Sequence, residues 1–308
     1  MRVLVTGGAG FIGSHLVKRL LSSGHVVTVL DNLSVGRREN VPPEAELIEL
    51  DVRSEELLEL VAGGRYEAIV HLAGQAKVSD SFVRPCFDSD QNIGGTINVL
   101  EAARLAGVER VIFASAAVVY GAVPEAELPI KELRKPKPKS FYGLSKLTAE
   151  SYLALYQKIY GLNYISLRFA NVYGERQSSG GEGGVIGLFA YAVAHGGDIT
   201  IYGDGEQTRD FVYVGDVAAG IEAALTTAQV NAVYNLSTQT ETSLRELVYI
   251  LGNIAGRRII PHYGPERPGD IYKASLSNGR ARMGLNWRPT VTLEEGLART
   301  FAYFKEQK

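Results

Sequence analysis

The first 31 residues restrict the fold more strongly than any other stretch of the chain. Residues 2–6 (RVLVT) form a short apolar run, rich in β-branched side chains, of the kind found in fully buried parallel strands. A glycine-rich turn at residues 7–13 (GGAGFIG) follows, then helical spacing from Ser14 to Leu21, and a second apolar run from Val26 to Leu30 that ends in Asp31. This order of strand, glycine turn, helix, strand and acid predicts a βαβ unit that binds a dinucleotide.

Each of the three glycines at positions 7, 10 and 13 has its own role in such a unit. Gly7 permits the tight turn, Gly10 lets the backbone approach a pyrophosphate, and Gly13 lets the helix pack closely on its strand. Free N–H groups at the start of the helix, at Phe11 and Ile12, favour the phosphates. A glycine turn with a purely structural role is the alternative interpretation.

Asp31 distinguishes between the two nicotinamide cofactors. A carboxylate at this place accepts hydrogen bonds from the ribose hydroxyls and repels a 2′-phosphate, which favours NAD over NADP. Arg37 and Arg38 follow closely and could in principle bind that phosphate. We interpret them as a solvated loop pair, because Asp31 would still face the phosphate, and we predict NAD.

Apolar runs and helical segments alternate as far as Asn171. Strands are expected at residues 47–50, 68–72, 110–114 and 164–169, and helices at residues 93–106 and 146–160. The alternation predicts an α/β fold, a Rossmann-type doubly wound parallel sheet with right-handed crossovers. Ligands then bind at the carboxyl ends of the strands, which makes candidates of the residues there: Asp51, Val52, Ala73, Gly74 and Asn92. Asn92 could equally serve only to open its helix.

Beyond Asn171 the pattern loosens. Residues 177–184 are rich in glycine and serine, residues 199–202 and 210–213 are expected to be strands on either side of a turn, and Asp216 is expected to cap a helix that ends at Leu225. A further core strand is expected at residues 233–236, with helices at 243–252 and 293–305. We predict a cofactor domain of residues 1–171 plus 213–236, and a smaller C-terminal α/β substrate lobe of residues 172–212 and 237–308.

Composition excludes several classes of function. The 308 residues are 45% hydrophobic and 21% charged, as in ordinary globular proteins, and the net charge of −2 argues against a nucleic-acid partner. Cys86 is the only cysteine, so an internal disulfide and a cysteine-rich metal site are excluded, and no metal is expected. No apolar run reaches the length needed to span a bilayer, and the chain begins with a core strand rather than a signal peptide. We expect a cytoplasmic protein with no membrane partner.

Tyr142 and Lys146 are the candidate catalytic residues. Residues four apart share one face of a helix, so their side chains project together. An ammonium group beside a phenol stabilises the phenolate and lowers its pKa from about 10 towards neutrality, as does a nicotinamide cation. Tyr142 is then a base for a hydroxyl proton while hydride leaves the same carbon. A Tyr-x-x-x-Lys spacing alone is common on helix surfaces, and it gains weight from residues 1–31.

Together these motifs resemble the extended short-chain dehydrogenase/reductase superfamily, and within it the nucleotide-sugar 4-epimerases. The resemblance covers nearly the whole chain and rests on residues 6–13, 31–32, 51–52, 71–74, 92, 119–121, 142–146, 167–174, 203–205, 209–212 and 267–271.

The resemblance implies NAD as cofactor, a UDP-sugar as substrate and a homodimer formed through residues 93–106 and 146–160. Burial of these helix faces inside the monomer is the alternative interpretation. It implies epimerisation at C4 of a UDP-hexose, such as the interconversion of UDP-glucose and UDP-galactose, through a transient 4-keto sugar. The implied cofactor contacts add Asn32, Leu72, Phe169, Tyr142 and Lys146 to those named above. The implied substrate contacts are Asn171, Arg209, Arg267 and Asp270, whose guanidinium and carboxylate groups suit a diphosphate and ribose hydroxyls. Surface ion pairs are the alternative interpretation of these four residues.

One position departs from the family pattern. A Ser or Thr that contacts the reacting sugar hydroxyl is replaced here by Ala116. Ser115 is adjacent, but neighbouring strand residues point to opposite faces, so Ser115 could take the catalytic role only if the strand end bends or bulges. Ala117 and Val118 replace the acid and base that a 4,6-dehydratase requires. A decarboxylase, an NADP-dependent reductase and a catalytically impaired NAD-binding sensor or scaffold remain as alternatives.

Ala274 is the expected determinant of substrate breadth. In the family, the position four residues after Asp270 lies beside the 2-substituent of the sugar, where a bulky side chain excludes N-acetyl groups. A methyl group there predicts that UDP-N-acetylglucosamine is also accepted. A shifted register would bring Tyr272 to the same wall and close the space.

Overall fold

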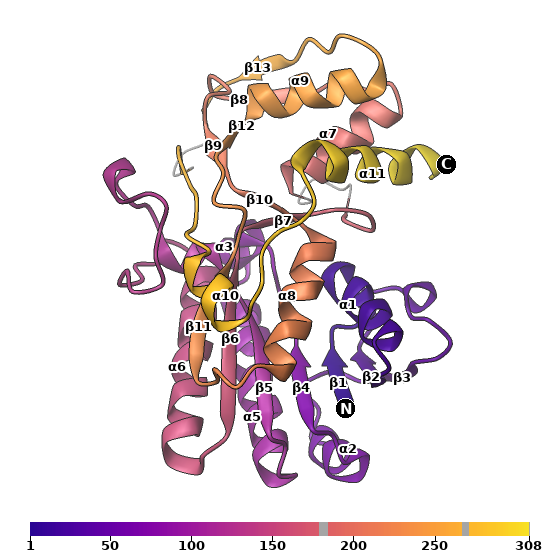
Figure 1. The fold of residues 1–308 in the computed structure, drawn as a ribbon, viewed down its shortest axis with the longest axis vertical. Coiled ribbons are helices and arrows are strands. Elements are labelled where there is room, and N and C mark those ends of the chain that lie inside the picture. The colour runs from indigo at the N-terminus through magenta and orange to yellow at the C-terminus, as the bar shows by residue number, and fades with distance from the viewer. Residues whose placement is uncertain (179–183, 267–270, 308) are drawn as a thin grey trace.

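The computed structural model describes residues 1–178, 184–266 and 271–307. Within them one sheet of seven parallel strands has the order β11-β6-β5-β4-β1-β2-β3 (Figure 1). This order confirms the predicted Rossmann-type sheet. The strands are β1 (Arg2–Thr6), β2 (Val26–Asp31), β3 (Glu46–Glu49), β4 (Ala68–His71), β5 (Arg110–Ala116), β6 (Asn163–Phe169) and β11 (Ala232–Leu236).

Helices cover both faces of this sheet because its strands are apolar on both sides. Val3 and Val5 join one apolar cluster with α1 (Phe11–Ser22) and α8 (Val214–Thr226), which pack on each other. Leu4 points the other way, into a cluster formed with the opposite helices. Those helices are α2 (Leu57–Gly64), α5 (Gly95–Leu105) and α6 (Phe141–Tyr160).

The strand order reverses beside β1. The chain proceeds from β1 to β2 and β3 on one side, and returns to β4 and β5 on the other. The carboxyl ends of β1 and β4 therefore border the crevice in which folds of this kind bind ligands. His71, at the end of β4, is buried there between Thr6 and Thr96 (2.7 and 3.1 Å), and burial lowers the pKa of its imidazole to about 3.

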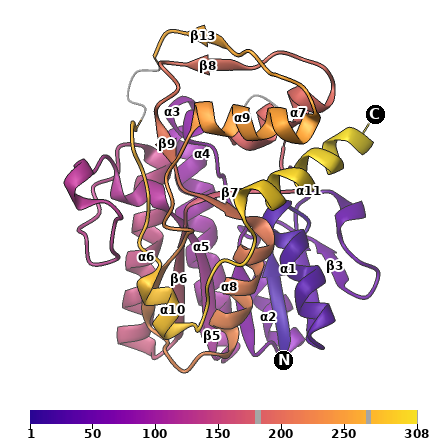
Figure 2. The ribbon, with the colours of Figure 1, turned by 45° about the horizontal axis from the view of Figure 1, so that its top comes forward.

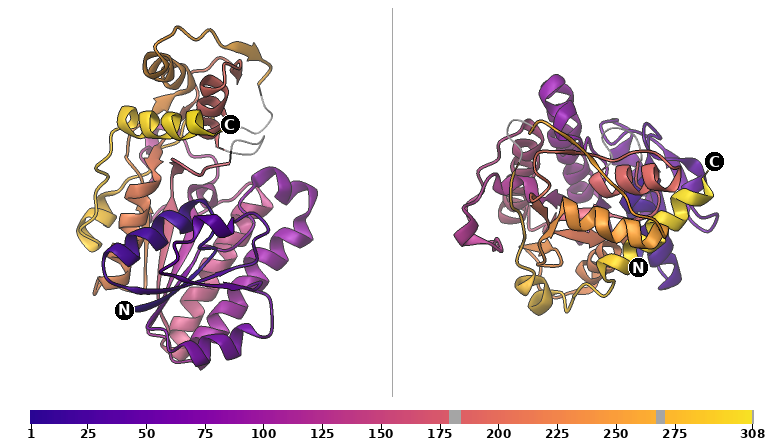
Figure 3. Two further views of the ribbon diagram at one scale, coloured as in Figure 1. Left: turned by 90° about the vertical axis from the view of Figure 1, so that its right-hand side faces the viewer. Right: turned by 90° about the horizontal axis from the view of Figure 1, so that it is seen from above.

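A smaller lobe lies over the carboxyl ends of the sheet (Figures 2 and 3). Its core is an apolar cluster that includes Phe189, Leu247 and Phe304, from three helices. Its helices are α7 (Val185–Ala194), α9 (Leu244–Ala255) and α11 (Leu293–Glu306). Its short strands pair as β7 (Asn171–Tyr173) with β10 (Phe211–Tyr213), β9 (Thr208–Arg209) with β12 (Thr242–Ser243), and β8 (Thr200–Tyr202) with β13 (His262–Gly264).

The helices near the crevice differ in detail from the sequence expectation. The helix expected from Lys146 is α6 and already begins at Phe141, after the N-cap Ser140, so it contains both Tyr142 and Lys146. The expected helix 93–106 is preceded by α3 (Val78–Val83), α4 (Pro85–Ser89) and a π-helical turn, Asp90–Gly94. Asn92 lies inside that turn, so the expectation that it opens a helix is wrong.

The strands expected on either side of the 203–205 turn are present as β8 and β10, and each has a separate partner: β8 pairs with β13 and β10 with β7. One expectation beside them is wrong. Asp216 does not cap α8, whose N-cap is Tyr213. Its carboxylate instead accepts hydrogen bonds from Thr290 and Val291, which lie between α10 (Gly279–Gly284) and α11.

Candidate active site

The glycine turn forms a cradle at the carboxyl end of β1. Gly7 has φ of +72°, and a Cβ there would lie 2.7 Å from the backbone nitrogen of Ala73, at the end of β4. A Cβ on Gly13 would collide with the carbonyl oxygen of Gly7. The helix that follows, α1, begins after Gly10 with no side-chain cap and no acidic residue in its first turn. Its N-terminal N–H groups at Phe11 and Ile12 are thus suited to an anionic phosphate.

Asp31 lies against this cradle at the end of β2. Its buried carboxylate accepts hydrogen bonds from the backbone N–H groups of Ala9 (3.0 Å) and Leu33 (2.9 Å). Burial raises the pKa of Asp31, and the two N–H groups oppose that shift. A Cβ on Gly36 would lie 2.9 Å from both carboxylate oxygens, so the backbone leaves little room for a 2′-phosphate beside them.

The neighbouring arginines are turned towards other carboxylates. Arg37 pairs with Glu39 (3.7 Å) and Arg38 with Glu49 (2.6 Å), in exposed ion pairs. Exposed pairs of this kind are weak. Both arginines nevertheless point to nearby carboxylates rather than to Asp31, as expected of a solvated loop pair.

Polar residues of the adjoining sheet edge contact one another. Asn32 donates a hydrogen bond to Asp51 (2.8 Å), and the Arg53 guanidinium binds both oxygens of that carboxylate (2.9 Å each). Hydrogen bonding to Arg53 holds the pKa of Asp51 well below its usual range. The side chain of Val52, which separates Asp51 from Arg53 in the sequence, is buried. The arrangement presents a fixed carboxylate and an amide at the place expected for the adenosine end of a cofactor.

Tyr142 and Lys146 project from the first turns of α6. The Lys146 Nζ lies 5.9 Å from the ring centroid of Tyr142 and 4.9 Å from that of Phe113. Burial lowers the pKa of Lys146 to about 8. The pKa of the Tyr142 phenol is raised, chiefly by burial and then by the charge of Asp88. The expected lowering of the phenol pKa is therefore not a property of this arrangement, in which desolvation and the charge of Asp88 both raise that pKa.

Three polar residues that the sequence analysis did not select adjoin this pair: Gln75, Asp88 and Ser145. Asn92 donates to the backbone oxygen of Gln75 (3.0 Å), to Asp88 (3.1 Å) and to the hydroxyl of Ser145 (3.2 Å). Asp88 also accepts from Gln75 (2.8 Å). The spacing of Asp88 four residues before Asn92 could have indicated a shared helical face. Their link to Gln75 and Ser145 depends on the tertiary fold.

Ser115 is not brought together with Tyr142. The register of β5 with β6 is unbroken from Arg110 to Ala116, so the strand end has no bulge. The hydroxyl of Ser115 donates to Glu150 (2.6 Å), which also forms a buried ion pair with Arg168 (2.6 Å). The condition for a catalytic Ser115 is thus absent at this strand end, and Ala116 occupies the terminal position.

The remaining predicted cofactor residues line the end of the sheet. The backbone N–H of Leu72 donates to Thr6 (3.1 Å), which fixes the chain just before Ala73 and Gly74. Phe169 ends β6 and pairs in register with Ala116. All of these lie at the carboxyl edge that the strand order makes a crevice.

The predicted substrate residues lie on the lobe side. Arg209 donates to the backbone oxygens of Thr208 (2.8 Å) and Ile271 (2.6 Å), and Asn171 donates to the backbone oxygen of Asp210 (3.2 Å). Ala274 is half-buried. Arg267 and Asp270 fall outside the described residues.

Tyr272, the competing candidate for the wall beside Ala274, is half exposed, and its hydroxyl donates to Asp204 (2.8 Å). That contact draws its ring towards the 203–205 turn.

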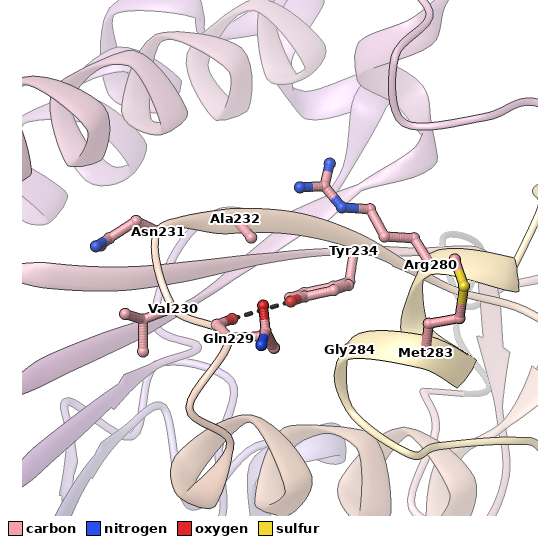
Figure 4. A pocket seen from close by; sticks show the side chains of 8 residues that line it. All are labelled: Gln229, Val230, Asn231, Ala232, Tyr234, Arg280, Met283 and Gly284. Atoms are coloured by element: carbon pink, nitrogen blue, oxygen red, sulfur yellow. Dashed lines mark hydrogen bonds between the residues drawn. The ribbon is translucent and has the colours of Figure 1, made fainter.

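A hollow of about 300 Å³ lies elsewhere, beside the amino end of β11 (Figure 4). It is lined by residues that include Tyr234 and Arg280, and it contains none of the predicted site residues. Asn231, at its rim, donates its backbone N–H to Tyr164 near the start of β6, at the end of the sheet opposite the crevice. This hollow is therefore separate from the candidate active site.

Among the described residues, no helix is both long enough and apolar enough to cross a membrane.

Comparison with known proteins agrees with this geometry. The NAD dependent epimerase/dehydratase family matches residues 3–237. A UDP-glucose 4-epimerase from Mycolicibacterium smegmatis is 41% identical over 313 residues, which span 100% of this chain and 99% of that protein.

Solved structures agree as well. A UDP-glucose 4-epimerase from Thermotoga maritima, solved with UDP-glucose, is 40% identical and superposes with a TM-score of 0.96 over 99% of each chain. The Thermus thermophilus UDP-glucose 4-epimerase in complex with NAD is 42% identical, with a TM-score of 0.93 over the whole of each chain.

Proposed function

Since the chain belongs to the NAD dependent epimerase/dehydratase family, we propose that it is a UDP-glucose 4-epimerase, which interconverts UDP-glucose and UDP-galactose with bound NAD. The observation that carries the proposal is the position of Tyr142 and Lys146 on one helix at the edge where the glycine cradle ends. The relatives named above support the choice of substrate.

Tyr142 is the group that moves a proton in this reaction. Its phenolate oxygen accepts the proton of the sugar 4-hydroxyl and later returns it to the 4-oxygen. Bound NAD supplies a reversible hydride acceptor for C4. Because burial raises the pKa of Tyr142, the phenolate depends on cationic neighbours, and Lys146 is the nearest one on α6.

The cofactor would be held by the crevice residues. The cradle fits a pyrophosphate, because a side chain at position 7 or 13 would collide with neighbouring backbone, and glycine at both positions lets the turn and helix pack closely. Asp31 would bind the adenosine ribose. The other proposed contacts are Gly10, Phe11, Ile12, Asn32, Asp51, Val52, Leu72, Ala73, Gly74, Asn92, Lys146 and Phe169.

The UDP-sugar would bind between this edge and the lobe. Arg209 supplies a guanidinium fork for the diphosphate, and Asn171, Arg267, Asp270 and Ala274 complete the proposed substrate site. We propose a corresponding division into an NAD-binding domain, residues 1–171 plus 213–236, and a nucleotide-sugar-binding lobe, residues 172–212 and 237–308. A diphosphate anchor with few contacts to the hexose would let the 4-keto sugar turn over and present its other face.

The protein is further proposed to act as a homodimer. Exposed apolar side chains lie on α5 and α6, at Leu105, Leu144, Leu155 and Ile159, and a second copy could cover them. Sedimentation of the purified protein tests this. The proposed setting is cytoplasmic galactose metabolism, because the proposed reaction interconverts UDP-galactose and UDP-glucose.

The decisive experiment is to incubate the purified protein with NAD and UDP-glucose and to detect UDP-galactose by NMR. We expect an equilibrium mixture, and a titration in which NAD binds more tightly than NADP because of Asp31. Absence of UDP-galactose at any enzyme concentration would refute the proposed reaction. Equal or tighter binding of NADP would refute only the assignment of the cofactor.

A further inference from the structure

Asp88 is a buried carboxylate next to the proposed catalytic pair. Its residue is 1% exposed, and its Oδ1 accepts hydrogen bonds from Gln75 (2.8 Å) and Asn92 (3.1 Å). Its Oδ2 is buried and has no hydrogen-bond partner. A buried carboxylate with an unsatisfied oxygen is destabilising unless a positive charge compensates it.

Lys146 is the matching buried cation. It is 5% exposed. Two further observations bring the groups together. A Cβ built on Gly74 would lie 2.5 Å from Asn92 Oδ1, itself without a partner, and 3.6 Å from Lys146 Nζ. The negative charge of Asp88 also raises the pKa values of both Lys146 and Tyr142.

Two other carboxylates around α4 are already paired. On α3, Asp80 pairs with Arg84 (2.7 Å) at the surface. In the π-helical turn, Asp90 pairs with Arg53 (2.5 Å).

On the remaining sides, α6 presents Tyr142 and Lys146 towards Asp88, and His71 on β4 is neutral at ordinary pH because burial lowers its pKa to about 3. Lys146 is thus the buried cation that faces Asp88 across α4 and α6.

We propose that Asp88 is a positioning residue of the active site: its carboxylate holds the amides of Gln75 and Asn92 in place and supplies the counter-charge for the Lys146 ammonium beside Tyr142. Lys146 stays protonated in a buried site because Asp88 offsets part of its desolvation. Asp88 thereby shifts the titration of both Lys146 and Tyr142 to higher pH.

A double-mutant cycle tests the charge pairing without relying on activity. The free energy of unfolding is measured for Asp88→Asn, Lys146→Met and the double variant, with NAD present at one fixed concentration. Asn preserves the shape of Asp and an acceptor for Gln75. We expect Asp88→Asn to destabilise the protein when Lys146 is present, but to be neutral or stabilising in the Lys146→Met background, where it removes an uncompensated carboxylate. Equal effects of Asp88→Asn in both backgrounds would overturn the proposal.

A pH profile of kcat/KM for UDP-glucose tests the functional consequence, which rests on the proposed function. Removing the negative charge lowers the pKa values of both Tyr142 and Lys146, so both limbs of the profile of Asp88→Asn should move to lower pH, by about one unit. A purely structural change would scale the rate and leave the limbs in place, and that result would overturn the proposal.

Asp80→Asn, on the adjacent helix and paired at the surface, is the matched control and should leave the profile unchanged. If the wild-type protein shows no interconversion at any pH, the proposed reaction fails, while the unfolding cycle still decides the role of Asp88.

Discussion

In the seven-stranded sheet, Val3, Leu4 and Val5 alternate between two apolar layers, and regular backbone pairing fixes every strand. The lobe has an apolar cluster of its own, but its loops are held by single buried carboxylates. Asp210 accepts hydrogen bonds from both the backbone and the hydroxyl of Thr238, from Gln239, and from Leu276. Repeated weak interactions position the proposed cofactor side, whereas a few specific contacts position the proposed substrate side.

This difference implies that the two sides can be perturbed separately. A change in one sheet residue is shared among many neighbours, and a change in Asp210 releases segments that are 28 and 66 residues away in the chain. The predictions below ask whether chemistry, substrate selection, substrate affinity and rate respond as this separation requires.

The largest effect is expected from Tyr142→Phe. The phenol is lost and the ring remains, so turnover should fall by about 10³-fold while the affinities for NAD and for UDP-glucose change little. Steady-state kinetics and calorimetric titrations measure both quantities. Tyr160→Phe, at the exposed end of the same helix, is the control and should keep its activity. Wild-type turnover in Tyr142→Phe would show that another group is the base.

Substrate selection should respond to the lobe alone. With Ala274 in place we expect UDP-N-acetylglucosamine to be used within about tenfold of UDP-glucose in kcat/KM, a difference of about 1.4 kcal/mol. Ala274→Tyr should reduce kcat/KM for the acetylated substrate by about 10²-fold more than kcat/KM for UDP-glucose, because exclusion by a clash is an effective route to specificity.

If the wild-type protein ignores UDP-N-acetylglucosamine at saturation, the open space beside Ala274 does not exist, and Tyr272 becomes the gate. Tyr272→Ala would then be expected to admit the acetylated sugar. NAD affinity should be unaffected in either variant, because both residues lie in the lobe.

Asp210→Asn is expected to weaken UDP-glucose binding by about tenfold and to leave the Kd for NAD nearly unchanged. The amide can keep one acceptor for Thr238 but not the full set of bonds that fixes the backbone at Gln239 and Leu276. A matched substitution on the surface of the lobe, Asp198→Asn, controls for charge. An equal loss of affinity for UDP-glucose and for NAD would contradict the separation of the two sides.

How much the sequence could predict follows the same division. The βαβ unit of residues 1–31 and the parallel sheet were predictable because periodicity, glycine and strand-end acids are local features. Tyr142 and Lys146 were recognisable from their spacing, and the structure places both on α6. The early start of that helix follows from its N-cap Ser140, which accepts a hydrogen bond from Gly143 (3.0 Å).

The strand pairing of the lobe and the polar contacts of the site were not predictable in this way. β8 pairs with β13, which is about 60 residues later, and no periodic pattern marks a three-residue strand. Asp216 has the sequence position of a helix cap, but its partners are 74 and 75 residues away. Asp88 likewise has meaning only once α4 lies against α6.

The smallest effect is expected from Ala116→Ser, which asks whether the cofactor side lacks a hydroxyl. The hydroxyl of Ser115 is bonded to Glu150 in the core, and the unbroken register gives it no route to the sugar. A serine at the terminal strand position would add a donor near the reacting 4-oxygen. Turnover should rise by about three- to tenfold, because one neutral hydrogen bond contributes about 1 kcal/mol.

The control is Ala117→Ser, one residue later in the turn that follows β5, which should leave the rate unchanged. An unchanged rate in Ala116→Ser would mean that a backbone group or an ordered water already serves the 4-oxygen. A gain in both variants would mean that polarity at this edge, rather than a positioned donor, limits the reaction. The geometry distinguishes these outcomes because a hydroxyl displaced by about 1 Å contributes little to a positioned transition state.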